Sequence, residues 1–177
     1  MKKNLSWIIA VLVLAAVFHL VAVKAFPTLV MNKLAKTSQE SGILPNTIFH
    51  SPRVDDKSRR VVRPSPDLIY SICGYDVSQK PLRITAPIPN TSYWSLSLFA
   101  SNTDNYFIVN DQQLKSGHLN LVLVGKGQSY SKDDDAIVVE AQTNIGAALF
   151  RMLVPDENKV EQLIKTRKMA KCQSVEL

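Results

Sequence analysis

The polar side chains that could carry chemistry gather at two places in the sequence. VVRPSPDLIYSICGYD holds Arg63, Asp67 and Tyr70, and the later stretch SNTDNYF adds Asn105. A carboxylate beside a guanidinium and a phenol could bind a small ligand or move a proton. The same residues also suit a β-corner, since Arg and Asp next to prolines commonly hydrogen-bond loop backbone. If Asp67 begins a strand, Tyr70 points to the opposite face, so both hypotheses stay open.

Searches for other catalytic patterns are negative. The three histidines are scattered, and no HExxH, CxxC or GxSxG motif occurs. GKGQS at 125–129 lacks the spacing of a phosphate loop. The acidic run at 133–135 lacks the alternating ligands of a calcium loop and is typical of a solvated hairpin tip. The sequence therefore predicts no metal and no cofactor.

Two cysteines, Cys73 and Cys172, lie 99 positions apart. An even number of cysteines in an exported domain favours a disulfide between them. The alternative is two buried free thiols. In the chain-entropy description, a bridge that closes a loop of about 100 residues contributes about 4.7 kcal/mol.

Residues 5–23 contain no Asp, Glu, Lys or Arg. Nineteen helical residues span about 28 Å, close to the hydrocarbon thickness of a bilayer. Lys2 and Lys3 precede this run, so the positive-inside rule predicts a cytoplasmic N-terminus and a periplasmic main domain. The alternative is a signal peptide cleaved after Ala25, which would release the domain into the periplasm. The run exceeds the usual 7–15 residues of a signal core, which favours an uncleaved anchor.

The charge beyond residue 25 is nearly balanced, with 18 Lys and Arg against 15 acidic residues. This balance argues against a nucleic-acid partner. Two basic stretches, 53–63 and 159–171, are typical of solvated faces, with contact to anionic lipid headgroups or an acidic partner as the alternative.

The order of elements predicts a mainly β protein. Pro27 is expected to end or kink the membrane helix, and 28–41 is helical in character with Gly42 as its cap. From Asp67 onward the apolar residues repeat with a period of two. Seven strands are predicted, at 67–77, 82–85, 93–100, 106–109, 119–124, 136–139 and 147–154.

A helix is predicted to begin at Pro155 and to carry Cys172 at its end, where the bridge would join it to the strand of Cys73. Together these elements predict an antiparallel β-sandwich or barrel with an N-terminal membrane helix and a C-terminal helix. The predicted division is an anchor at 1–26, a short helix and linker at 27–44, and an extracytoplasmic domain at 45–177.

Three stretches of the sequence carry a family resemblance. VVRPSPDLIYSICGYDVSQKPLRITAP, YWSLSLFASNTDNYFIVND and TNIGAALFRMLVPDE resemble the domain of unknown function 1254 family over roughly residues 45–172. The chain is similar to the short, membrane-anchored branch, which lacks the companion 1214-type domain of longer relatives. The resemblance implies a β-sandwich and a separate companion protein, and it implies no established reaction. Arg63, Asp67, Tyr70 and Ser71 match motif positions of the family.

The sequence thus favours a membrane-anchored binding or assembly module of the bacterial cell envelope, working with a companion protein. The alternative function is a periplasmic enzyme with a polar cleft around Arg63, Asp67 and Tyr70, to which Asn105 could contribute. A third hypothesis is a passive structural protein of the envelope.

Overall fold

The computed structural model describes residues 2–59, 63–89, 92–114, 117–130 and 135–176. Its helices are α1 (Lys2–Glu40) and α2 (Val160–Lys168), the latter preceded by a 3-10 turn, Glu157–Lys159. Its strands are β1 (Thr47–His50), β2 (Leu68–Asp76), β3 (Leu82–Pro87), β4 (Trp94–Ala100), β5 (Asn105–Asn110), β6 (His118–Val124), β7 (Ile137–Glu140), β8 (Ile145–Leu153) and β9 (Lys171–Ser174).

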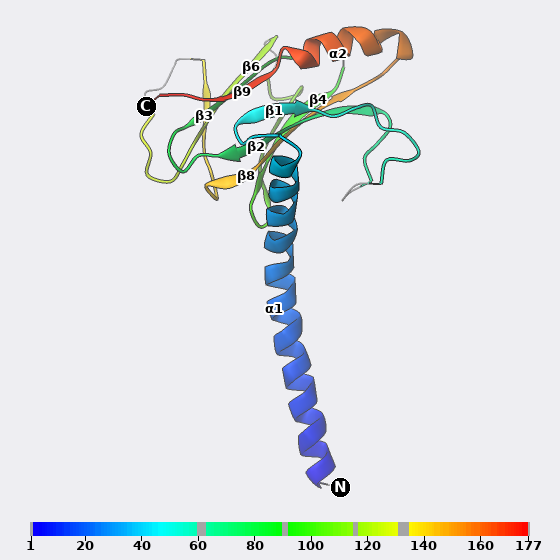
Figure 1. The fold of residues 1–177 in the computed structure, drawn as a ribbon, viewed down its shortest axis with the longest axis vertical. Helices are drawn as coiled ribbons and strands as arrows, with labels where there is room; N and C mark the ends of the chain where they lie inside the picture. The colour runs from blue at the N-terminus through cyan, green and yellow to red at the C-terminus, as the bar shows by residue number, and fades with distance from the viewer. Residues whose placement is uncertain (1, 60–62, 90–91, 115–116, 131–134, 177) are drawn as a thin grey trace.

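Helix α1 protrudes from the β-rich part of the molecule (Figure 1). It is long and apolar enough to cross a membrane, with a mean hydropathy of 2.6 in its most apolar window. Of the two predicted effects of Pro27, an end of the helix is wrong, because α1 continues through this residue to Glu40, and a kink stays a prediction. It ends where Gly42 adopts a φ of 79°. The amide of Ile43 then donates to the carbonyl of Ser38 at 2.9 Å, which confirms the predicted glycine cap.

The strands form two sheets, with the orders β1-β2-β8-β4-β5 and β7-β6-β3-β9. All seven predicted strands are confirmed to within two residues at each end. Neighbouring strands are antiparallel except β6 and β7, which are parallel. A hairpin was predicted between β6 and β7, and this prediction is wrong. The two strands are parallel, and twelve residues, 125–136, connect them. A connection of that length can carry the chain back to the start of a parallel neighbour.

Two strands are additional to the prediction. β1 lies between the predicted linker at 27–44 and the first predicted strand at 67–77, and β9 lies where the C-terminal helix was expected to continue. Helix α2 ends at Lys168, so Cys172 belongs to a strand and its placement at a helix end is wrong. β1, TIFH, has its two apolar residues side by side, and β9, KCQS, has no aliphatic or aromatic residue, so neither shows a period of two.

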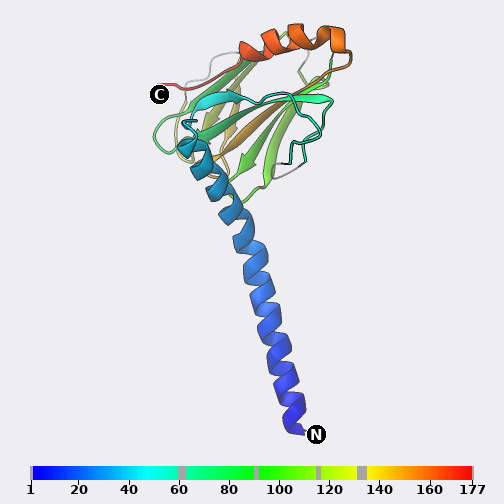
Figure 2. The ribbon, with the colours of Figure 1, turned by 45° about the vertical axis from the view of Figure 1, so that its right-hand side comes forward.

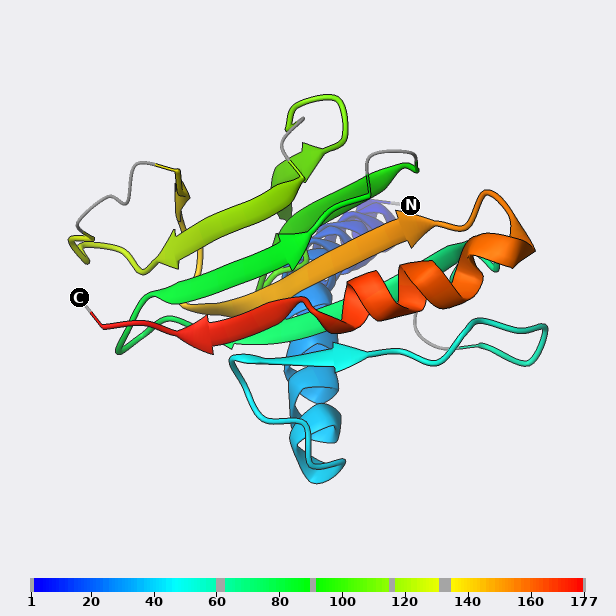
Figure 3. The same ribbon diagram turned by 90° about the horizontal axis from the view of Figure 1, so that it is seen from above.

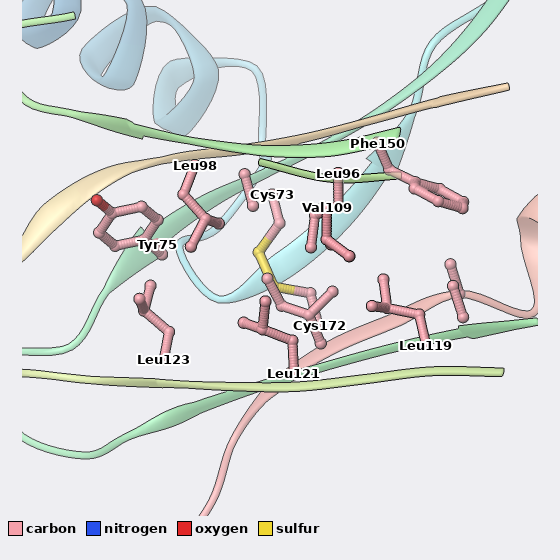
Figure 4. Packing of buried hydrophobic residues seen from close by; sticks show 14 of the residues in the cluster. Cys73, Tyr75, Leu96, Leu98, Val109, Leu119, Leu121, Leu123, Phe150 and Cys172 are labelled. Atoms are coloured by element: carbon pink, nitrogen blue, oxygen red, sulfur yellow. A yellow bond between two sulfur atoms is a disulfide. The ribbon is translucent and has the colours of Figure 1, made fainter. Parts of the chain in front are cut away.

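The hydrophobic core lies between the two sheets. Figure 4 shows Leu96, Leu98 and Phe150 on one side of it and Leu121 and Leu123 on the other. These five side chains are all at least 97 % buried. Trp94, Leu96 and Leu98 share one face of β4 and belong to this core.

The disulfide between Cys73 and Cys172 crosses the core (Figure 4). Its Cα atoms are 6.5 Å apart. Because β2 belongs to the five-stranded sheet and β9 to the four-stranded sheet, the bridge joins the two layers of the sandwich. The predicted pairing is therefore confirmed, although it joins a strand to a strand.

The two sheets lie at different distances from the protruding helix. In Figure 1, β2 and β8 lie beside the top of α1, and β6, β9 and α2 lie above them. Figure 3, viewed from above, has the four-stranded sheet and α2 in front and α1 behind. Figure 2 confirms that the helix leaves the sandwich on the side of the five-stranded sheet. The outer face of this sheet is therefore directed toward the N-terminal part of α1.

Candidate functional site

The residues predicted from the sequence lie at separate places. Tyr70 and Ser71 are neighbours on β2 and point to opposite sides of the sheet, so that Ser71 is buried on the core side. Asp67, just before β2, and Arg63 are both exposed. Asn105 begins β5, and β8 and β4 lie between that strand and β2. Three strand spacings amount to roughly 14 Å, so Asn105 does not join the other four.

Two of these side chains hydrogen-bond to nearby backbone. The hydroxyl of Tyr70 accepts from the amide of Ser65 at 2.8 Å, which braces the corner before β2. The amide nitrogen of Asn105, in its favoured orientation, donates to the carbonyls of Phe107 at 3.1 Å and Leu98 at 3.2 Å. Tyr70 thus braces the corner before β2, a role that the sequence left open for Arg63 and Asp67, and Asn105 braces the start of β5.

Ser71 forms a hydrogen-bonded pair that sequence reasoning missed. Its Oγ lies 2.8 Å from Nδ1 of His50 on β1. Burial, and then the positive charges of Arg167 and Lys168, lower the pKa of His50 below its usual 6.5. A serine beside a neutral histidine could in principle be an activated nucleophile. Ser71 is only 1 % exposed, however, and faces the core, so a substrate cannot reach its Oγ.

Arg167 of α2 completes this cluster. It is 6 % exposed, and its Nη1 donates to the carbonyls of Ser51 at 2.9 Å and Tyr70 at 3.0 Å. The guanidinium thereby fastens α2 to β2 and to the end of β1. The sequence held one signal for this role, because Arg167 follows Leu163 by one helical turn on the buried stripe of α2.

A cavity of about 240 Å³ lies where the chain passes from α1 into the sandwich. It is lined by Pro45, Asn46, Asp76, Ser78, Gln79, Lys80 and Ser174. None of the predicted site residues lines it. Asn46 has a φ of 59°, and its side-chain amide donates to the Asp76 carbonyl at 2.8 Å and to Ser174 Oγ at 2.9 Å. Asn46 therefore fastens the connection from α1 to both sheets.

The outer face of the five-stranded sheet carries partly open apolar side chains among polar ones. We call it the open face and define it by the apolar outward side chains of the five strands: Phe49, Leu68, Ile72, Phe99, Ile108, Ile145, Leu149 and Leu153. The polar side chains on the same side are Thr47, Tyr70, Asp76, Ser95, Ser97, Asn110 and Arg151. Ile72, Ile108 and Ile145 are exposed, at 38, 44 and 51 %. The other five side chains are half-buried. Exposed apolar patches on a sheet mark surfaces that contact other molecules.

Arg151, on the central strand β8, lies within the open face. Its Nε donates to Ser95 Oγ at 3.2 Å and its Nη2 to Ser97 Oγ at 3.1 Å. Both serines are fully buried, although they lie on the outward side of β4. No acidic side chain in the described part of the chain forms an ion pair with Arg151. The open face thus presents the guanidinium of Arg151, which Ser95 and Ser97 hold in place among apolar side chains.

Comparison with known protein families shows which family this chain belongs to. The family model "Protein of unknown function (DUF1254)" matches residues 45–174, nearly three quarters of the chain. The chain belongs to the DUF1254 family. This confirms the resemblance found in the sequence, and the match includes Arg63, Asp67, Tyr70 and Ser71. No curated protein matches this DUF1254 chain.

Two solved structures share the fold of this DUF1254 protein. The VPA0106 protein from Vibrio parahaemolyticus is 11 % identical with a TM-score of 0.70, and the match covers 86 % of this chain and 36 % of that one. An uncharacterised protein from Burkholderia cenocepacia is 14 % identical with a TM-score of 0.54, with 86 % and 41 % covered. The DUF1254 chain thus spans less than half the length of either protein.

Proposed function

We propose that this DUF1254 protein is a membrane-anchored binding and assembly module of the bacterial cell envelope, working with a companion protein. The observation that carries the proposal is the open face, an exposed apolar sheet surface with the braced guanidinium of Arg151 inside it. Large open apolar surfaces are costly in water unless a partner covers them.

The proposed location follows from two features. Lys2 and Lys3 precede the apolar part of α1, which favours a cytoplasmic N-terminus. The disulfide between Cys73 and Cys172 favours an oxidising compartment for the sandwich. We therefore place α1 in the inner membrane as an uncleaved anchor and the domain at 45–177 in the periplasm.

The positions of the candidate residues support binding over catalysis. An active site needs its polar groups to converge on a space that a substrate can enter. Tyr70 and Ser71 lie on opposite sides of β2, and Asn105 lies three strands away. The cavity beside Asn46 contains none of them.

The test is the size of the protein in mild detergent extracts of native membranes. We expect a complex larger than the monomer, and we expect Ile108→Lys on the open face to reduce it to the monomer. Val138 is the matched control, since it is 40 % exposed on the outer side of β7, and Val138→Lys should preserve the complex. A monomer in wild-type membranes would contradict the proposed function.

A further inference from the structure

The cavity at the junction of α1 and the sandwich is built from three segments that lie far apart in the sequence. Its walls are residues 45–46 before β1, residues 76 and 78–80 at the end of β2 and in the turn to β3, and Ser174 at the end of β9. Since β2 and β9 belong to different sheets, both layers of the sandwich contribute to the walls. Pockets for drug-sized ligands have about 300–1,000 Å³, so the cavity volume of about 240 Å³ suits a smaller ligand, of the size of a metabolite.

Asp76 supplies a carboxylate oxygen with spare hydrogen-bonding capacity. Its Oδ1 accepts from the backbone amide of Ser78 at 2.9 Å and from the Ser78 hydroxyl. Its backbone amide donates to Oδ1 of Asn46, and its carbonyl accepts from Nδ2 of Asn46, both at 2.8 Å. These bonds hold Asp76 in place, and no described residue donates to its Oδ2. One oxygen of the carboxylate is therefore available to a ligand.

Lys80 supplies a positive charge to the same cavity. Its Nζ donates to Oε1 of Glu176 at 2.5 Å, which uses one of the three N–H groups of an ammonium. Both side chains of this pair are at least half exposed, and exposed pairs contribute little to stability, so a ligand anion can compete with Glu176. Asp76 and Lys80 do not pair with each other in the described part of the chain. The cavity therefore holds two opposite charges that do not neutralise one another.

Two neutral side chains add further hydrogen-bonding groups. The side-chain amide of Gln79 bonds to none of the described residues, and it can both donate and accept. The hydroxyl of Ser174 accepts from Nδ2 of Asn46 at 2.9 Å and keeps its own proton to donate. Polar groups with spare capacity thus line a space that a small molecule can enter, which is the property that the other candidate residues lack.

A ligand that matches both charges carries an ammonium and a carboxylate. The ammonium has three donors for an acceptor such as Oδ2 of Asp76, and the carboxylate accepts from the Nζ of Lys80. Hydrogen bonds with an ionised partner are about twice as strong as neutral ones. A ligand with only one of the two groups gains only one of these contacts. Amino acids and dipeptides carry both groups on a small body.

We propose that this cavity binds the ammonium and carboxylate groups of a free amino acid or a dipeptide, with Asp76 as the partner of the ammonium and Lys80 as the partner of the carboxylate. The site goes beyond the function proposed above and does not depend on the open face. Its walls belong to the connection from α1 and to both sheets. A bound ligand therefore adds contacts between these parts and should slow local opening there.

The experiment is saturation-transfer NMR of the full-length protein in detergent, with L-leucine as the probe. Two analogues lack one charge each, since 3-methylbutylamine keeps only the ammonium and 4-methylpentanoate keeps only the carboxylate. We expect L-leucine to bind at least tenfold more tightly than either analogue, because each analogue loses a hydrogen bond to a charged group. Glycyl-leucine distinguishes the two sources of the ligand. A lower Kd for L-leucine supports a free amino acid, and a lower Kd for glycyl-leucine supports a dipeptide.

Variants assign the two ends of the ligand. Asp76→Asn keeps an oxygen for the Ser78 amide and should weaken L-leucine binding at least tenfold, while the Kd of 4-methylpentanoate stays unchanged. Lys80→Gln should weaken L-leucine binding at least fivefold and leave the Kd of 3-methylbutylamine unchanged. Glu161→Gln and Lys165→Gln are the matched controls, because both residues are exposed on α2 and neither lines the cavity. Both controls should bind L-leucine as the wild type does.

Hydrogen exchange locates the bound probe. L-leucine should slow exchange in segments 43–47, 76–80 and 172–176 and leave α2 unchanged. Retention of the disulfide shows that each variant folds, and Lys80→Gln changes only an exposed pair. Equal binding of L-leucine and its two analogues, equal weakening by the control variants, or no binding of any probe would each overturn the proposal. Each of these results leaves the function proposed for the open face standing, since the two surfaces are tested separately.

Discussion

Removing the disulfide should cost this domain a large part of its stability. The Cys73–Cys172 bridge joins the two sheets across a separation of 99 residues. In the chain-entropy description, a loop of that size contributes about 4.7 kcal/mol, and native bridges typically contribute 2–5 kcal/mol. We expect the double variant Cys73→Ala, Cys172→Ala to lose about 3–5 kcal/mol of unfolding free energy. That loss is a large fraction of the roughly 5–15 kcal/mol of an ordinary domain.

The assay is urea unfolding of the full-length protein in detergent, followed by the fluorescence of Trp94, which is buried in the core. The urea midpoint should fall strongly, and the slope should rise because the unfolded chain without the bridge is less compact and exposes more surface. The melting temperature should drop by roughly 10 °C. Wild-type protein treated with reductant should match the double variant, and reductant should leave that variant unchanged. The reasoning is refuted if wild-type protein keeps its midpoint after mass spectrometry shows that Cys73 and Cys172 are both alkylated.

Three further predictions concern the packing around the sheets. A Cβ on Gly146 would run into the backbone and side chain of neighbouring strands, whereas one on Gly74 meets open space. Gly146→Ala should therefore destabilise by about 1–3 kcal/mol and Gly74→Ala by under about 0.5 kcal/mol in thermal unfolding, and equal effects would argue against this packing. Burial and the charges of Arg167 and Lys168 lower the pKa of His50, so the unfolded chain takes up the proton first and stability should fall as the pH drops below 6.5. His50→Gln should flatten that slope between pH 7.5 and 5.5, and an unchanged slope would contradict the assignment. Arg167→Met removes the guanidinium donor from the carbonyls of Ser51 and Tyr70, of which the Tyr70 carbonyl keeps the Ser51 amide. It should cost about 1–3 kcal/mol, whereas Lys168→Met, on the exposed side of α2, should cost under about 0.5 kcal/mol in the same assay.

The strongest patterns in the sequence predicted the strands well. β4 combines alternation with large apolar residues, and Trp94, Leu96 and Leu98 on one of its faces lie in the core. β1 and β9 escaped prediction because neither TIFH nor KCQS alternates apolar and polar residues, and each strand is fixed by pairing with a neighbour distant in sequence. Pro27 lies inside α1 because a long helix tolerates the loss of one internal hydrogen bond.

The candidate site was harder to predict because it depends on strand order. The period of two places Arg151 on the outward side of β8, but it does not say which strands lie beside β8. Pairing brings Tyr70 and Ser95 next to Arg151 from 81 and 56 positions away. The open face therefore became visible only with the sheet order. The pairing of Cys73 with Cys172 was predictable because only two cysteines exist.

The central claim, that a partner covers the open face in the cell, can be tested by labelling a single introduced cysteine. Ile108 is suitable because it is exposed and lies far along the chain from both native cysteines, which are bonded to each other. Ile108→Cys should react slowly with a membrane-impermeant maleimide in native membranes and rapidly in the purified protein. Val138→Cys should react at the same rate in both preparations. Equal rates for Ile108→Cys in membranes and in pure protein would contradict the claim.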